Sequence, residues 1–240
     1  HDTFEMVQEF AADAPAFPEG HPLLVREGQV DYLYFATPYP LMRTKATVES
    51  YFDLGGYESF TCLKPGSTLA KAEIDRDEAG QVRYGWKRNT PPVNPQEQAK
   101  LVQRGLLRAD EGWVQTKDAA SGKAVLLHVG SVYWNEYRKR YVMIAVELFG
   151  TLMLGEVWYA EAEAPIGPWP QAVKIVTHDK YSFYNPKQHP QFDQDGGRVI
   201  YFEGTYTHTF SGNEQRTPRY DYNQIMYRLD LGDERLGGAK

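Results

Sequence analysis

The chain has 240 residues, 42% of them hydrophobic and 14% aromatic, and a formal net charge of −6 at pH 7. A chain of this length and composition can bury a full hydrophobic core without disulfides or metals. The acidic balance and the lack of a basic block argue against a nucleic-acid partner, because phosphate binding needs clustered Lys and Arg. A single cysteine, Cys62, excludes an intramolecular disulfide. We expect no membrane span, because no segment is long and apolar enough.

Short apolar and alternating segments dominate the sequence and predict β-strands separated by Gly- and Pro-containing turns. A longer helix is expected where Asn94 can cap the first turn and Pro95 can occupy the first helical position. The pattern predicts an all-β protein with one domain over residues 1–240 and one helical insertion. In chain order we expect a strand at 30–37, a short helix at 44–52, the helical insertion at 94–107, and strands at 123–134, 140–148, 155–162, 172–178, 198–207 and 222–231.

Two stretches repeat one pattern. HPLLVREGQVDYLYFAT (21–37) and HPQFDQDGGRVIYFEGT (189–205) both contain His-Pro, an apolar position, a charged turn with glycine, and a strand that reaches Tyr-Phe. Repetition of a β-unit that cannot bury its faces alone is typical of propellers and solenoids. The stretch GSVYWNEYRKRYVMIAVE (130–147) has the same rhythm without His-Pro. Its spacing from the copy at 189–205, roughly fifty residues, suits four strands per unit.

These openings, together with the phrase GEVWYAEAEAPIGPWPQA at 155–172, resemble the blades of five-bladed β-propeller glycoside hydrolases, the clan of arabinanases, xylosidases, fructosidases and related galactosidases. The resemblance implies four-stranded antiparallel blades around a central funnel and an oligo- or polysaccharide partner. About four units are visible, which implies a partial propeller whose N-terminal blade lies outside this sequence. The chain departs from the family at its catalytic base, an Asp where His21 stands, and at its acid, a Glu where Gly130 and Ser131 stand.

The candidates for catalysis are His189, His21 and two glutamates on apolar strands, Glu147 and Glu203. Histidine suits acid–base chemistry because it titrates near neutral pH. The alternatives for His189 are a structural histidine that holds the strand and a metal ligand. No His, Cys or carboxylate spacing supports the latter, so we expect neither metal nor cofactor. For the glutamates, and for Glu156, a salt bridge to a neighbouring Arg or Lys is the alternative.

The resemblance also implies that polar and aromatic side chains lie around His189, because strand starts converge at the funnel of a propeller. Amides, guanidinium groups and aromatic rings bind sugars through hydrogen bonds and stacking. The expected sugar-binding residues are Tyr184, Asn185, Gln188, Asn135, Trp134, Arg219 and Asp221. The basic segment 137–140 is expected to be a solvated hairpin turn.

The sequence predicts a carbohydrate-active protein that hydrolyses glycosidic bonds of an oligo- or polysaccharide. The alternative is a non-catalytic carbohydrate-binding or scaffold propeller, and it gains support because the family's carboxylate pair does not map residue by residue. A third hypothesis is a polysaccharide lyase that uses Tyr184, Lys187 and His189. The composition and the expected glycan partner predict a periplasmic or secreted bacterial protein. Because the chain begins with His1, either a leader has been removed or the sequence is a segment of a longer protein.

Overall fold

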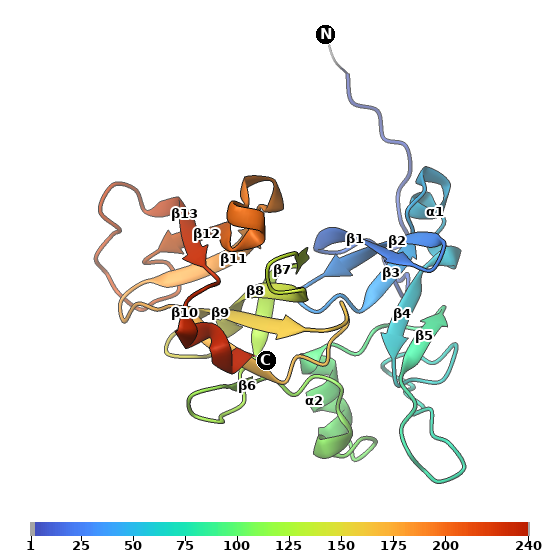
Figure 1. The fold of residues 1–240 in the computed structure, drawn as a ribbon. Coiled ribbons are helices and arrows are strands. Elements are labelled where there is room, and N and C mark those ends of the chain that lie inside the picture. Colours follow the sequence, from blue (N-terminus) through green and yellow to red (C-terminus); the bar gives the residue numbers. More distant parts are fainter. Residues whose placement is uncertain (1–2, 240) are drawn as a thin grey trace. The chain divides into compact units, whose positions relative to one another are not determined.

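The computed structural model describes residues 3–239, and these residues are mostly β (Figure 1). Their strands form three sheets, and none of the three closes on itself. The all-β expectation is therefore confirmed. The described chain forms two compact units: the first runs to Phe35 and resumes over Leu41–Glu111, and the second comprises Ala36–Pro40 and the chain from Gly112 onward. No helix among the described residues is long and apolar enough to cross a membrane.

The first unit contains a five-stranded sheet in sequential order and two helices. Its elements are β1 (His21–Glu27), β2 (Val30–Ala36), β3 (Met42–Lys45), α1 (Val48–Phe52), β4 (Glu58–Thr61), β5 (Gly85–Arg88) and α2 (Pro95–Gln103).

Helix α2 begins and ends where local chemistry requires. The Asn94 side chain accepts a hydrogen bond from the backbone N–H of Glu97 at 2.9 Å, and Pro95 occupies the first turn. At the other end Gly105 adopts a φ of +70°, and the N–H of Leu106 bonds back to the carbonyl of Leu101 at 3.0 Å. This glycine-terminated cap stops the helix before residue 107, so the insertion is confirmed but shorter than expected.

The second unit contains two sheets, with strand orders β6-β10-β9-β8-β7 and β11-β12-β13. All pairings between these strands are antiparallel except the short one between β10 and β6. Their bounds are β6 (Lys117–Asp118), β7 (Leu127–Asn135), β8 (Arg140–Leu148), β9 (Leu154–Ala162), β10 (Gln171–Val176), β11 (Ser182–Gln188), β12 (Val199–Thr207) and β13 (Tyr222–Asp230).

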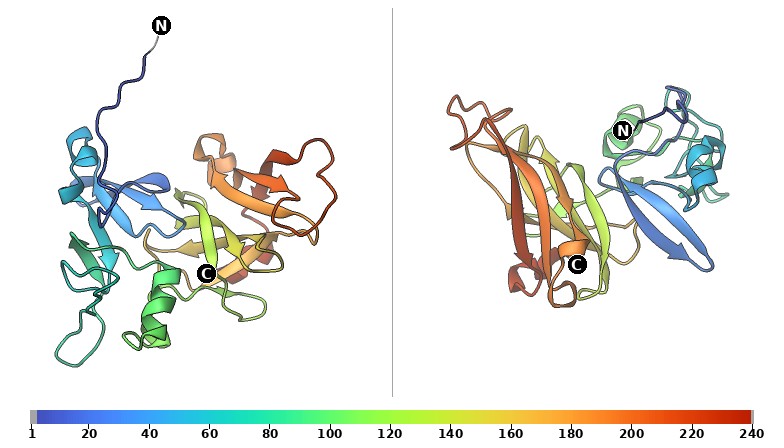
Figure 2. Two further views of the ribbon diagram at one scale, coloured as in Figure 1. Left: turned by 180° about the vertical axis from the view of Figure 1, so that it is seen from behind. Right: turned by 90° about the horizontal axis from the view of Figure 1, so that it is seen from above.

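The two sheets of the second unit pack face to face around one hydrophobic core. In the view from above, the orange-to-red strands lie beside the green-to-yellow strands (Figure 2). Strand β8 contributes Ile144 and Val146 to this core, and β12 contributes Ile200 and Phe202. Because side chains alternate along a strand, the residues between them point away from the core, each on its own side of the packed pair of sheets.

The hairpin between β7 and β8 is better anchored than expected. Arg138 Nε lies 2.6 Å from Oε1 of Glu161, whose side chain is fully buried, and the Tyr159 hydroxyl donates to the same oxygen at 2.5 Å. The basic turn at 137–140 is therefore only partly solvated, because one of its guanidinium groups neutralises a buried carboxylate.

The two His-Pro openings differ in structure. His21 and Pro22 begin β1 at the edge of its sheet, where a missing N–H is tolerated. His189 instead follows β11, and Pro190 begins a short 3-10 turn, Pro190–Phe192, before β12. The expected strand start at His189 is therefore wrong, and the expected repeat holds only for the strands that follow, β2 and β12. The sheets also have five, five and three strands instead of four each.

Candidate functional site

The predicted catalytic residues do not form a single cluster. His21 belongs to the first unit, whereas the other three belong to the second. Within the second unit, Glu147 alternates with the core residues of β8, and Glu203 alternates with those of β12. The two glutamates therefore lie on opposite sides of the packed sheets, and the expectation that they line one funnel with His189 is wrong. Two separate clusters remain.

The first cluster is the glutamate pair, Glu147 and Glu156, which lies across the hairpin between β8 and β9. Both carboxyl groups converge on Gly150 in the turn. A Cβ added at this glycine would lie 2.6 Å from Glu147 Oε2 and 2.5 Å from Glu156 Oε2. Such contacts are too short for any side chain, so a glycine at this position gives the two carboxyl groups the room to approach each other.

The surroundings of Glu147 favour the protonated form of its carboxyl group. Burial raises the pKa of its carboxyl group, and the negative charge of Glu156 raises it further, together with a hydrogen bond to Glu156 that only a protonated Glu147 can donate. The indole Nε1 of Trp158 donates to Glu147 Oε2 at 2.8 Å, which opposes the shift and fixes the orientation of the carboxyl group.

Glu156 is held in the ionised form. Glu156 is 1% exposed, and this burial disfavours its charged form. Hydrogen bonds from the hydroxyl and the backbone N–H of Thr151 outweigh burial and lower the pKa of Glu156. Lys174 Nζ lies 3.2 Å from Glu156 Oε1 and 5.2 Å from the centre of the Trp158 ring. The pair thus consists of one carboxyl group with a raised pKa beside one with a lowered pKa, which is the arrangement used for acid and base roles.

A cavity of about 460 Å³ lies nearby, and it shares with the pair one neighbour, Lys174, which is among its lining residues and whose Nζ contacts Glu156. Neither glutamate of the pair lines this cavity. We call it the Lys174 pocket. Its lining residues are Asp118, Ala119, Ala120, Val173, Lys174, Arg235 and Gly238.

The second cluster surrounds His189 and Glu203, which the structure does bring together. His189 Nε2 lies 3.2 Å from Glu203 Oε1, although this nitrogen forms no well-aligned hydrogen bond. The amide Nε2 of Gln191 lies 3.2 Å from His189 Nδ1. If that amide donates, the proton of a neutral imidazole resides on Nε2, facing the carboxylate.

Asp193 adds a third titratable group to this cluster. Burial raises the pKa of its carboxyl group to about 6, although the side-chain amide of Gln188, with Nε2 3.2 Å from Oδ2, favours the charged form. The His189 cluster could therefore exchange a proton near neutral pH through Asp193.

Two of the expected sugar-binding residues are buried structural residues. Asn135 is 1% exposed, and its side chain donates to the carbonyl of Gly197 at 2.8 Å and accepts from the N–H of Arg138 at 2.8 Å. Gln188 is also 1% exposed, and its backbone N–H donates a hydrogen bond to the Ser131 hydroxyl at 2.8 Å. The prediction that these side chains bind sugar is wrong, because both are buried in the packed interior, although Oε1 of Gln188 has no hydrogen-bond partner there.

The remaining expected binding residues are more accessible but scattered. Trp134 is 42% exposed, and its Nε1 donates to Glu136 at 2.9 Å. Asn185 is exposed at a bulge in β11, with a φ of +47°. Tyr184 is half-buried against the core. Arg219 and Asp221 lie exposed in the loop before β13. No feature of the sequence around these five residues links them to the glutamate pair.

Sequence reasoning identified Glu147 but not its pairing with Glu156. The signal was present, because the strands expected at 140–148 and 155–162 are joined by a short turn that contains Gly150. A hairpin between them places the last residues of one strand opposite the first residues of the next. The contributions of Trp158 and Lys174 needed the register, in which Trp158 lies between Ala145 and Lys174 on neighbouring strands.

A comparison with protein-family models found no match to this chain, and no curated protein matched it. The assignment of a function therefore depends on the geometry of the clusters. Among the residues that the structure describes, no three His, Cys, Asp or Glu side chains gather as a metal site would require.

Proposed function

We propose that this protein hydrolyses glycosidic bonds of an oligo- or polysaccharide, with Glu147 as the proton donor and Glu156 as the ionised carboxylate. The observation that carries the proposal is the convergence of two carboxyl groups on Gly150 with their pKa values shifted in opposite directions. Glycoside hydrolysis requires such a pair, one group neutral and one charged.

The spacing favours a retaining reaction. Both Oε2 atoms lie within 2.6 Å of one point at Gly150, so they are no more than about 5 Å apart, which is less than the roughly 6.5–9.5 Å separation that leaves room for water in inverting enzymes. A sugar that enters between the two groups must break the hydrogen bond between them. Glu147 would protonate the glycosidic oxygen as its bond to the anomeric carbon breaks, while a Glu156 oxygen forms a bond to that carbon. Water would then attack the same carbon, giving a proton to Glu147 and releasing Glu156.

The neighbours of the pair support these roles. Thr151 and Lys174 stabilise the charge that Glu156 needs as a nucleophile. Trp158 orients the acid, and positioned acids and bases account for a large part of enzymatic rate enhancement.

The resemblance of the sequence to five-bladed propeller hydrolases agrees with this proposal at a coarse level. Face-to-face packing of open antiparallel sheets, as in the second unit, is how neighbouring blades bury their surfaces. We therefore propose that the sheets are blades of a propeller and that the protein acts on glycans in the periplasm or outside the cell.

A second candidate function is binding of carbohydrate without catalysis. The burial of Glu156 favours it, because a residue that is 1% exposed and already bonded through both oxygens to Thr151 can serve to hold the turn. In that case the pair would be a structural unit, and a glycan would bind without being cleaved.

Turnover measurements separate the two functions. The protein would be assayed against a panel of aryl glycosides and of plant and algal glycans, alongside Glu147→Gln, Glu156→Gln and the control Glu163→Gln, whose side chain is 83% exposed. Hydrolysis that both pair variants reduce by about 100-fold or more, and the control does not, supports catalysis. Glycan binding with no turnover of any substrate would replace it with the binding function.

A further inference from the structure

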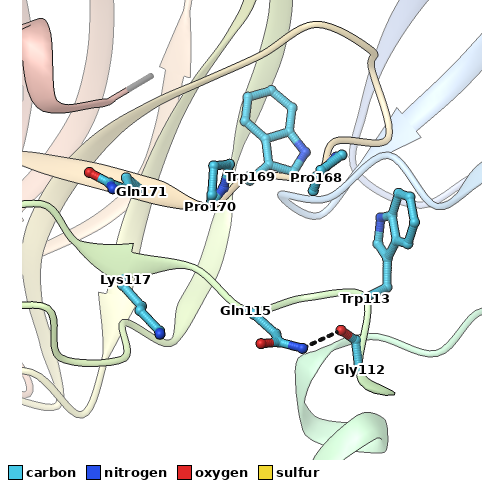
Figure 3. Close-up of a pocket in the computed structure, with 8 residues that line it drawn as sticks. All are labelled: Gly112, Trp113, Gln115, Lys117, Pro168, Trp169, Pro170 and Gln171. Atoms are coloured by element: carbon cyan, nitrogen blue, oxygen red, sulfur yellow. Dashed lines mark hydrogen bonds between the residues drawn. The ribbon is translucent and has the colours of Figure 1, made fainter. Parts of the chain in front are cut away.

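A second cavity lies in the same unit, on the other side of the short strand β6. It has a volume of about 450 Å³, and we call it the Trp113 pocket (Figure 3). Its lining residues are Gly112, Trp113, Gln115, Lys117, Pro168, Trp169, Pro170 and Gln171.

Hydrogen bonds between its two walls hold this pocket in shape. The N–H of Lys117 bonds to the carbonyl of Pro170 at 3.1 Å, and the Thr116 hydroxyl bonds to the carbonyl of Trp169 at 2.8 Å. The indole N–H of Trp113 donates to the carbonyl of Ile166 at 2.8 Å. The walls are therefore fixed before a ligand arrives, which reduces the entropy lost on binding.

The lining combines an aromatic ring with polar groups and one cation. In Figure 3, Gln115 and Lys117 lie on one side of the pocket, opposite the segment from Pro168 to Pro170, and the indole of Trp113 stands at one end. An indole face with amide donors and acceptors suits a hydroxylated ring. The Trp113 pocket thus has the chemistry of a sugar-binding site.

The charge in the pocket indicates which kind of sugar. Lys117 is exposed and forms no ion pair with any described residue, and no acidic residue is among those that line the pocket. The whole chain carries a net charge of −6, so a cation without an acidic partner in a cavity marks a local preference for a negative group.

The two pockets lie along one sheet edge. Lys117 and Asp118 pair in parallel with Gln171 and Ala172 of β10. Lys117 and Gln171 line the Trp113 pocket, whereas Asp118 and Lys174 line the Lys174 pocket. Because side chains alternate along a strand, Lys117 and Asp118 point to opposite faces of the sheet, so the two pockets are separate and the Trp113 pocket is considered by itself.

We propose that the Trp113 pocket binds one sugar unit of an oligosaccharide built from uronic acids, with Trp113 stacked on the sugar ring and Lys117 paired with its carboxylate. The inference deepens the proposed function and rests on it for the glycan partner. Binding at the Trp113 pocket is measurable without cleavage.

The test uses calorimetric titration of the full chain with oligomers of galacturonate, glucuronate and mannuronate, each compared with its methyl ester. The ester keeps the ring and removes the charge. The variants are Lys117→Gln, Trp113→Phe and Trp113→Ala, with Lys123→Gln as the control because this exposed lysine makes the same charge change outside either lining.

We expect one acidic oligomer to bind more tightly than its ester, and Lys117→Gln to weaken binding of the acid form by about tenfold, as the loss of a charge-assisted hydrogen bond does. The ester should bind the wild type and this variant equally. Trp113→Ala should weaken both forms, Trp113→Phe should weaken them less, and Lys123→Gln should change neither.

Three results would overturn the proposal: no acidic oligomer binds, acid and ester bind equally, or Lys123→Gln weakens binding as much as Lys117→Gln. These results are independent of catalysis. Loss of turnover in Glu147→Gln with Lys117-independent binding would leave the proposed function standing and remove the uronate site. Lys117-dependent binding without turnover would do the reverse.

Discussion

The imidazole Nε2 of His189 and the carboxylate Oε1 of Glu203 lie 3.2 Å apart on the side of the β11–β12–β13 sheet that faces away from the core. Glu147 and Glu156 lie beyond the other sheet of the same unit, so the packed core separates the two clusters. This separation assigns them different roles: the glutamate pair carries the proposed chemistry, and His189 holds the turn that follows β11.

The first prediction concerns His189→Ala. We expect the free energy of unfolding to fall by about 1 kcal/mol, because a partly exposed contact between His189 and Glu203 and a side-chain hydrogen bond are each worth little. The turnover of any glycan that the protein cleaves should stay unchanged. Chemical denaturation and steady-state kinetics would measure the two effects. Loss of turnover with an unchanged melting temperature would instead place the active site at His189.

The second prediction concerns pH and Asp193. Its pKa is raised by burial from 3.8 to about 6, so the folded protein binds this proton more tightly than the unfolded chain. Stability from this group is therefore present at pH 4 and is lost as the pH rises to about 6. Asp193→Asn cannot ionise, so the variant should become steadily more stable relative to wild type between pH 4 and pH 6.

Urea unfolding at several pH values would measure that difference. Asp195→Asn is the matched control, because this carboxylate is exposed in the same connection between β11 and β12. An equal pH dependence for both variants, or a constant difference between Asp193→Asn and wild type, would contradict the assignment.

The strands of the second unit were predictable from sequence because alternation is a local signal. The expected strand at 140–148 coincides with β8, and those at 155–162, 198–207 and 222–231 each differ from the observed strand by one residue at one end. Strand β11 was missed because it contains Pro186 and a bulge at Asn185, which interrupt the alternation that marks a strand.

The candidate site was less predictable because it depends on register and on the stacking of sheets. Sequence reasoning grouped residues at expected strand starts, and this grouping failed for Asn135 and Gln188, which are buried, the first against backbone groups and the second against Ser131 and Asp193. It succeeded for His189 and Glu203, which are fourteen positions apart. They meet because β11 and β12 are antiparallel neighbours, with Lys187 paired to Glu203.

The third prediction concerns the buried ion pair between Arg138 and Glu161. Glu161→Gln removes the charge that neutralises Arg138 Nε at 2.6 Å, while the guanidinium group, 15% exposed, stays mostly buried. Breaking one side of such a pair costs about 3–5 kcal/mol, and we expect a loss near the lower end because water reaches Arg138. Glu163→Gln, two residues further along and paired with Arg140 at the surface, should change the free energy of unfolding by less than about 1 kcal/mol. Equal effects in thermal or chemical denaturation would contradict the structural role of Glu161.

The last prediction concerns Gly150→Ala. The new methyl group would lie about as close to Glu147 Oε2 as to Glu156 Oε2, at 2.6 and 2.5 Å, so the two carboxyl groups must move apart. Separation weakens the repulsion from Glu156, so the pKa of Glu147 should fall toward its ordinary value, although burial, the larger cause, should keep it raised. Carbon-13 NMR of the glutamate carboxyl groups would follow this shift without any substrate.

Turnover of Gly150→Ala should fall at least about tenfold, since catalytic groups displaced by a fraction of an ångström to an ångström lose rate steeply, and stability should fall by about 1–3 kcal/mol. Gly237→Ala is the control, because an added Cβ there meets nothing within 4 Å. An unchanged pKa of Glu147 in a folded Gly150→Ala protein would mean that the two carboxyl groups do not act on each other through this turn.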